Sequence, residues 1–348
     1  MMKIPIAELW NNLTNRTLLD ARTPAEFDKG HIPSAINFPL FSNEERVIVG
    51  TTYKQVSPEK ALIKGLELVG PKMADFVKTA IQIAPNRKVM LHCWRGGKRS
   101  GSLAWLLTLA AFDVITIEGG YKSYRAYIQE QFNHLSLQLI VLGGKTGSGK
   151  TAILQQLAAK GEQIIDLEAL AAHKGSAFGW IGEPQQPKTE RFENDLFEAT
   201  RTLHPTKRIW VENESKGIGT VRIPDGFWNL MKSSPLINLE VPFDCRVNHL
   251  VDVYTHTNQE DLIASFQKIE KRIGNEMTKK AKEALEIGDF KTAAGIGLKY
   301  YDKLYSFGFD TNPSPSKYIL EIPDNNYNQT ADDLINFANN NIHSTHDS

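Results

Sequence analysis

Residues 137–151 read Leu-Gln-Leu-Ile-Val-Leu-Gly-Gly-Lys-Thr-Gly-Ser-Gly-Lys-Thr. The apolar run at 137–142 predicts a buried strand, and the residues that follow the glycines predict a helix over 151–159. A glycine-rich turn between such elements, closed by Lys and Thr, is typical of a loop that binds phosphate. The expected phosphate-binding residues are Gly144, Lys145, Thr146, Gly147, Ser148, Gly149, Lys150 and Thr151.

Each part of this loop has a physical task. Backbone amides wrap the phosphate oxygens, Lys150 supplies a point charge, and Thr151 offers a ligand for Mg²⁺. The pattern indicates a diphosphate or triphosphate ligand, and it does not specify a nucleotide.

A second loop, earlier in the chain, carries a cysteine. Residues 88–92 predict a buried strand that leads directly into Cys93, and residues 99–111 predict an apolar helix. Backbone N–H groups, the helix N-terminus and three basic side chains would all favour thiolate over thiol, so we expect a nucleophilic Cys93. An inert buried cysteine is the alternative, which the basic, glycine-rich continuation disfavours. The expected anion-binding residues of this loop are Trp94, Arg95, Gly96, Gly97, Lys98 and Arg99.

Composition narrows the class of protein. The chain has 348 residues, a hydrophobic content of 41% and no formal net charge, which are values of an ordinary globular protein. Zero net charge means that any nucleic-acid partner must meet a local basic surface. Two cysteines do not make a disulfide framework, and they suit a reducing cytoplasm. The N-terminal residues lack the apolar core of a signal peptide, and no apolar run is long enough to span a membrane.

The order of the predicted elements indicates an α/β fold with two domains that meet at a polar joint over residues 131–136. Short apolar runs alternate with helical patterns over residues 1–130, as in a parallel-sheet domain. A second parallel-sheet domain, of the P-loop NTPase-like kind, is expected over residues 137–325. Its predicted strands lie at 163–166, 208–212, 237–241 and 317–322, and a charged helical segment runs from about 246 to 307. Residues 339–348 are predicted to form a flexible tail.

Acidic residues end two of the predicted strands in the second domain. They are Asp166, Glu168, Glu212 and Glu214. Acids at this position often bind a metal or orient a reactant beside a phosphate loop, while others only cap helices or pair with nearby bases. We expect one or two of the four to be functional. The loops at 173–176 and 185–188 are further candidates for the wall of the same cleft.

Basic residues gather at helical spacing in the charged segment. Lys271, Arg272, Lys279 and Lys280 are the candidates for binding RNA, with the aromatic residues Tyr300, Tyr301, Tyr305 and Phe307 nearby. Basic side chains beside aromatic rings can hold RNA phosphates and stack bases. A solvated surface helix next to an aromatic core explains the same pattern and is the simpler interpretation.

The first 130 residues resemble the rhodanese family. The matching stretches are Leu19-Asp20-Ala21-Arg22, Glu26-Phe27, Gly30 to Asn37, the loop from Cys93 to Ser100, and Glu118-Gly119-Gly120-Tyr121. The resemblance implies that Cys93 carries a transferable chalcogen, as a persulfide or its selenium analogue. It also implies that Asp20 and Arg22 serve structure and polar bonding.

A rhodanese domain ahead of a P-loop domain resembles the tRNA 2-selenouridine synthase family. The likeness extends to residues 43–55, to Asp166-Leu167-Glu168, His173 to Ser176 with Phe178-Gly179, Val211 to Ser215, and Tyr300-Tyr301-Asp302 with Tyr305. It covers about residues 15–306. One loop, residues 186–190, departs from the family pattern, which expects Ser and Gln after Pro187.

The resemblance implies the following chemistry. Wobble 2-thiouridine in tRNA is first S-alkylated by geranyl diphosphate, and the S-geranyl group is then displaced with selenium from selenophosphate to give 2-selenouridine. The phosphate loop would hold the prenyl diphosphate, Mg²⁺ could assist it, and Cys93 would handle selenium. No tightly bound cofactor, no membrane and a cytoplasmic location are implied. The partners are wobble-uridine tRNAs and an enzyme that supplies selenophosphate.

Two other functions fit the same residues. In an ATP-dependent tRNA thiolation enzyme, the phosphate loop would activate the base with ATP while Cys93 delivered sulfur. In a sulfur-responsive P-loop switch there would be no catalysis, and the activated setting of Cys93 would then have no purpose. A test of whether the protein binds geranyl diphosphate or ATP distinguishes selenouridine synthesis from the first alternative.

Overall fold

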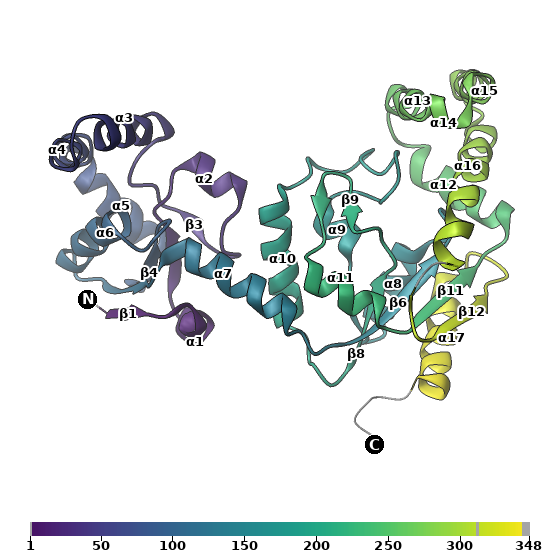
Figure 1. Cartoon of the computed structure of the whole chain (residues 1–348), viewed down its shortest axis with the longest axis horizontal. Coiled ribbons are helices and arrows are strands. Elements are labelled where there is room, and N and C mark those ends of the chain that lie inside the picture. The colour runs from purple at the N-terminus through teal and green to yellow at the C-terminus, as the bar shows by residue number, and fades with distance from the viewer. Residues whose placement is uncertain (1, 311–312, 343–348) are drawn as a thin grey trace. The chain divides into compact units, whose positions relative to one another are not determined.

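The computed structural model describes residues 2–310 and 313–342, and for residues 304–310 it describes the backbone alone. The chain forms two compact units, residues 1–131 and 132–348 (Figure 1). Among the described residues, no helix has the length and apolar character needed to cross a membrane. The predicted α/β class is confirmed, because each unit is built on a five-stranded parallel sheet flanked by helices.

The first unit has the strand order β1-β5-β4-β2-β3, and all its neighbouring strands are parallel. Its strands are β1 (Met2–Ile4), β2 (Thr17–Asp20), β3 (Ile36–Asn37), β4 (Lys88–His92) and β5 (Asp113–Ile117). Its helices are η1 (Ile6–Glu8), α1 (Leu9–Leu13), α2 (Pro24–Lys29), α3 (Asn43–Gln55), α4 (Pro58–Val69), η2 (Gly70–Lys72), α5 (Met73–Ile83), α6 (Lys98–Leu109) and α7 (Gly120–Asn133). Side chains of α5 and α6 pack with β4 to form the core.

Helix α7 extends into the first half of the segment that the sequence predicts to be a polar joint, and ends at Asn133. Residues 131–133 are helical because Phe132 is fully buried and packs edge-on against Phe197. A single buried aromatic ring within a polar stretch therefore extends the helix into the second unit.

The second unit has the strand order β12-β11-β6-β8-β7, again entirely parallel. Its sheet strands are β6 (Gln138–Gly144), β7 (Gln163–Ile165), β8 (Arg208–Glu212), β11 (Leu236–Glu240) and β12 (Lys317–Glu321), and a separate hairpin joins β9 (Gly217–Ile218) and β10 (Val221–Arg222). Its helices are α8 (Lys150–Ala159), α9 (Leu167–Ala171), α10 (Thr189–Arg201), α11 (Asp225–Lys232), α12 (Phe243–Tyr254), α13 (Gln259–Lys268), α14 (Glu270–Ile273), α15 (Asn275–Glu286), α16 (Phe290–Asp310) and α17 (Tyr327–Asn341).

Helices α8 and α17 pack together over the sheet, with side chains such as Leu154 and Leu334 in one core. Because Ala338 is buried in that core, α17 runs to Asn341, and residues 339–341 are helical where the sequence predicts a flexible tail. Residues 343–348 of that tail lie outside the described part of the chain. The charged segment forms α12 to α16, and in Figure 1 helices α13, α14 and α15 lie beyond the edge of the sheet.

Candidate active site

The Cys93 loop connects β4 to α6 in the first unit. The carbonyl of Cys93 accepts a hydrogen bond from the backbone N–H of Tyr121 at 2.9 Å, and Cys93 is 3% exposed. The hydroxyl of Ser100 lies 3.2 Å from Cys93 Sγ and donates to it. Gly96 has φ +61°, and a Cβ there would lie 2.5 Å from the carbonyl oxygen of Ile117, so only glycine fits. The loop thus holds the sulfur at the start of α6.

The basic residues of this loop divide into two groups. Arg95 and Lys98 are exposed, as is Trp94. The guanidinium of Arg99 instead binds Glu26, with N–O distances of 2.5 and 3.1 Å. Burial alone would raise the pKa of Glu26, but Arg99 outweighs it and lowers the pKa. The positive charge directed at a ligand of Cys93 therefore comes from Arg95, Lys98 and the helix N-terminus.

Asp20 and Arg22 form a buried ion pair at 2.6 Å beneath this loop. Arg22 also donates to the carbonyl of Gly30 at 2.8 Å, and its guanidinium lies 3.7 Å from the centre of the Tyr121 ring. Burial would raise the pKa of Asp20, but nearby positive charge from His92 and Arg22 lowers it. Arg22 thus holds Tyr121 in the first turn of α7, and the backbone of Tyr121 in turn binds the carbonyl of Cys93.

The phosphate loop lies between β6 and α8, at the carboxyl end of the second sheet. The ammonium group of Lys150 donates to the carbonyl of Gly144 at 3.1 Å, and so closes over the loop. Gly149 has φ +73°, and a Cβ there would lie 2.5 Å from the ring of Tyr327. The loop conformation thus depends both on glycine and on a residue from the first turn of α17. Lys145 is directed toward Glu240, at 3.6 Å.

The four strand-end acids take different positions around this loop. Asp166 caps α9, since its carboxylate accepts from the backbone N–H of Ala169 at 2.8 Å. Glu168 accepts from the hydroxyl of Thr151 at 2.8 Å and, with Glu214, lines the cleft. Glu212 is fully buried, accepts from the backbone N–H of Glu168 at 2.8 Å, and leaves its other oxygen without a partner.

Burial makes two of these acids hold their protons tightly. Burial and the neighbouring acids raise the pKa of Glu212 well above its ordinary value. Burial, together with the charge of Glu168, raises the pKa of Glu214 to about 8, against the opposing attraction of Lys150. The Glu214 carboxyl therefore holds its proton more tightly than an ordinary glutamate does, in the wall of the cleft that Glu168 also lines.

A cleft of about 590 Å³ opens over the phosphate loop. The loop after α9 contributes Lys174, Gly175 and Ser176 to its wall, as the sequence suggests. The neighbouring loop candidate, Gln186, has a structural role instead: its amide donates to the carbonyls of Ala171 and Ile218 at 2.9 and 3.1 Å. None of residues 186–190 is among the residues that line the cleft.

Two further residues, one behind the phosphate loop and one in the cleft, are not evident from the sequence. Arg246 of α12 is buried, binds both carboxylate oxygens of Asp302 at 2.7 Å, and donates to the carbonyl of Thr146 at 3.2 Å. Lys232 lines the cleft, its Nζ lies 4.3 Å from the ring centre of Trp228 on the same helix, α11, and burial lowers the pKa of Lys232. The partners of Arg246 lie far away in sequence, so no local pattern marks this residue.

The candidate RNA-binding residues lie on α14 and α15, outside the cleft. Lys271, Arg272, Lys279 and Lys280 are all exposed. Lys280 pairs with Glu276 at 2.7 Å and Lys279 lies 3.8 Å from Glu283, both on the same helix. Tyr300 raises the pKa of Arg272 through a hydrogen bond. The side chains of Tyr305 and Phe307 lie outside the described part of the structure.

The comparisons with known proteins match both units. A model of the tRNA 2-selenouridine synthase AAA domain matches residues 137–315, and a model of the rhodanese-like domain matches residues 6–127. Three curated proteins named tRNA 2-selenouridine synthase are similar along most of the chain. The protein from Sulfurovum sp. (strain NBC37-1) is 32% identical over 336 residues, which cover 87% of this chain and 91% of its own length.

The protein from Shewanella pealeana is 33% identical over 344 residues, which cover 88% of this chain and 93% of its own. The protein from Nitrosomonas europaea is 35% identical over 268 residues, which cover 75% and 68%. These matches confirm the resemblance found in the motifs of both loops. With its rhodanese-like and P-loop units in this order, the chain belongs to the tRNA 2-selenouridine synthase family.

Proposed function

We propose that this protein converts wobble 2-thiouridine of tRNA to 2-selenouridine through an S-geranyl intermediate, with geranyl diphosphate held at the phosphate loop. The observation that carries the proposal is the cleft itself. Its lining includes the phosphate loop with Lys150, and also the apolar side chains of Leu250 and Val253 and the ring of Tyr254 from α12. A ligand with a diphosphate head and an apolar body matches both parts of this lining, and this favours a prenyl diphosphate over ATP.

The first step is alkylation of the base. The sulfur of 2-thiouridine attacks C1 of the geranyl group, the C1–O bond breaks, and diphosphate leaves with the bonding electrons while the base loses its N3 proton. Lys150 and the loop amides stabilise the charge that develops on the leaving diphosphate. Trp228 gives the cleft an aromatic face on which the base can stack.

If Mg²⁺ binds here, the hydroxyl of Thr151 and the carboxylate of Glu168 are the oxygen ligands that would hold it, because hard cations prefer such oxygens. No group of three or more His, Cys, Asp or Glu side chains within the described residues could hold a metal ion, so the ligand's own oxygens would have to contribute. When bound, Mg²⁺ would neutralise part of the diphosphate charge.

The second step replaces sulfur by selenium. Alkylation turns the sulfur into a thiol leaving group, so a selenium nucleophile can add at C2 of the base while the C2–S bond breaks and geranylthiol departs. Selenophosphate is the selenium source, its P–Se bond is hydrolysed to phosphate, and we assign selenium delivery to the Cys93 loop. Exposed Arg95 and Lys98 suit an anionic donor. An enzyme that supplies selenophosphate is the corresponding partner, and the cytoplasm is the location where tRNA and this donor meet.

Ligand binding tests the proposal against the ATP-dependent alternative. Calorimetry should detect geranyl diphosphate binding to the wild type, and Lys150→Ala should weaken it at least about tenfold by removing a charge-assisted contact. Lys160→Ala is the matched control, because Lys160 ends the same helix and pairs with Asp332 at 2.8 Å. Tight ATP binding without geranyl diphosphate binding would instead establish the thiolation alternative.

A further inference from the structure

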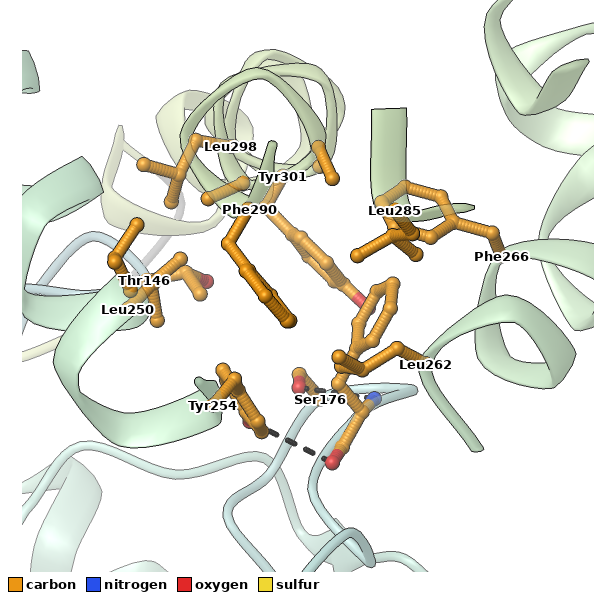
Figure 2. Close-up of a pocket in the computed structure, with 15 residues that line it drawn as sticks. Thr146, Ser176, Leu250, Tyr254, Leu262, Phe266, Leu285, Phe290, Leu298 and Tyr301 are labelled. Carbon is orange, nitrogen blue, oxygen red and sulfur yellow. Dashed lines mark hydrogen bonds between the residues drawn. The ribbon is translucent and has the colours of Figure 1, made fainter. Parts of the chain in front are cut away.

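A second, smaller cavity lies beside the phosphate cleft. It measures about 60 Å³, and it is lined by residues of α12, α13, α15 and α16 together with Thr146, Ser176 and Phe178 from two loops (Figure 2). Its walls are almost entirely hydrocarbon and include Phe266, Leu285, Phe290 and Leu298. An apolar cavity of this kind is poorly suited to water, which needs polar partners, and well suited to an apolar group.

The cavity and the cleft share one boundary. Thr146, Ser176, Leu250, Tyr254 and Tyr301 line both of them. The hydroxyl of Tyr254 is directed to the carbonyl of Phe178 at 3.5 Å, and the hydroxyl of Tyr301 accepts from the backbone N–H of Ala177 at 2.9 Å. The 176–178 loop thus binds both hydroxyls. The apolar faces of the two rings are then left to line the boundary that the cleft and the cavity share.

We propose that this cavity receives the far end of the hydrocarbon chain of the prenyl diphosphate, and that Gly297 and Phe290 set the length of chain accepted. The inference rests on the proposed function, because it takes the diphosphate to be at the phosphate loop. A cavity of about 60 Å³ is too small for the whole ligand, so it takes the end of the chain while the rest of the chain lies along Leu250, Tyr254 and Tyr301.

The two residues act on the space in opposite ways. Figure 2 shows the ring of Phe290 projecting into the middle of the cavity, between the side formed by Thr146 and Leu250 and the side formed by Leu285 and Phe266. Gly297 lies in the wall, and a Cβ there would meet the Phe266 ring at 3.8 Å, an ordinary van der Waals contact. Substitution of Gly297 therefore fills the cavity, and truncation of Phe290 enlarges it.

Gly295 provides a matched control on the same helix. A Cβ at Gly295 would meet the Phe243 ring at 3.9 Å, also an ordinary contact, and Gly295 does not line the cavity. Neither glycine has a positive φ, so a side chain introduces no backbone strain at either position. Changes at the two sites alter helix propensity alike, and the change at Gly297 alone reaches the cavity.

The experiment measures binding of inorganic diphosphate and of dimethylallyl, geranyl and farnesyl diphosphates to the full chain. Each methylene removed from an apolar environment weakens binding about fourfold. We expect Gly297→Ala to weaken geranyl diphosphate about fourfold and Gly297→Val at least about tenfold, with inorganic diphosphate within about twofold of wild type. Gly295→Ala and Gly295→Val should leave every ligand within about twofold. Phe290→Ala should improve farnesyl relative to geranyl diphosphate.

The results separate the two proposals. If geranyl diphosphate binds and Lys150→Ala weakens it, but the Gly297 variants match the Gly295 variants, the chain lies elsewhere and the inference fails alone. Equal losses for inorganic and geranyl diphosphate in Gly297→Val would also overturn it, since they would show damage to the phosphate loop. If the wild type binds no prenyl diphosphate, the proposed function and the inference fail together.

Discussion

At the scale of single residues, the carboxyl pair beside Thr151 is the part of the site with the most unusual chemistry. The sequence places four acids at strand ends but cannot distinguish the cap, Asp166, from the cleft-lining Glu168 and Glu214. That distinction depends on which carboxylate meets Thr151 and which is deprived of water, and both depend on how β7 and β8 lie in the finished sheet. Burial decides the pKa of Glu214, and no local pattern encodes it.

The raised pKa of Glu214 predicts how stability changes with pH. The folded protein keeps this proton up to pH about 8, whereas an unfolded glutamate loses it near pH 4.5. Between these values the folded state binds more protons, so its stability falls as pH rises, by up to about 1.4 kcal/mol per pH unit, and no further loss occurs above pH 8. Glu214→Gln keeps a hydrogen-bonding side chain without the titration, so its stability should change less over this window.

Urea unfolding at a series of pH values between 5 and 9 checks this expectation. The exposed Glu286 on α15 provides the control, since Glu286→Gln should keep the wild-type pH dependence. Identical pH profiles for wild type and Glu214→Gln would mean that Glu214 is ionised in the folded protein at neutral pH.

At the scale of elements, the sequence predicts what depends on near neighbours. Strands β6 and β4 and the loops after them follow directly from apolar runs and glycines. The helical hairpin α3–α4 carries readable start signals as well, since Ser42 with Glu45 forms a capping box and Ser57 caps α4. The bidentate contact between Arg246 and Asp302 could not be predicted, because a buried arginine on a helix has meaning only once α12 and α16 are packed together.

The basic residues on α14 and α15 predict a salt-dependent contact with tRNA. Neutralising Lys271, Arg272, Lys279 and Lys280 together should weaken tRNA binding and flatten its dependence on salt, by about 0.7–0.9 in log–log slope for each RNA phosphate that is no longer neutralised. Filter binding of tRNA across a salt titration measures both effects. Lys279 and Lys280 are partly neutralised by Glu283 and Glu276 on the same helix. For these two lysines we therefore expect a change in slope at the lower end of that range.

A charge-matched control comes from the first unit, where Lys54, Lys60, Lys64 and Lys78 can be neutralised instead. Geranyl diphosphate binding should be unchanged in both combined variants, since neither set lines the phosphate cleft. An unchanged salt slope in the α14–α15 variant would place the RNA on another surface, with Arg95, Lys98 and Lys122 near Cys93 as the next candidates.

At the scale of the whole molecule, the two candidate sites lie on different units. The thiol belongs to the first unit and the phosphate cleft to the second, and the motifs alone were enough to assign both. The cavity beside the cleft could not be predicted from the sequence. Most of the residues that line it come from four helices, and in the sequence they look like ordinary core residues.

The proposed roles of the two sites predict different tRNA nucleosides in two variants. Cys93→Ala should abolish selenium incorporation while S-geranyl-2-thiouridine persists, and Lys150→Ala should lose both the S-geranyl and the selenium products. Mass analysis of bulk tRNA nucleosides from cells carrying each variant measures them. Cys245→Ser is the control thiol change, since Cys245 lies on α12 with its sulfur near the carbonyl of Pro323. Full levels of 2-selenouridine with Cys93→Ala would exclude Cys93 as the selenium-handling residue.

The late position of β12 and α17 in the chain has a consequence for synthesis on the ribosome. The first sheet is complete once β5 has emerged, so the thiol-bearing unit can fold while later residues are still being translated. The phosphate loop must wait, because Tyr327 of α17 packs against Gly149 and β12 pairs with β11 only near the end of translation. In a nascent chain, the Cys93 loop can therefore fold before the phosphate loop does. A chain truncated within β12 would have a folded first unit and an incomplete sheet in the second unit.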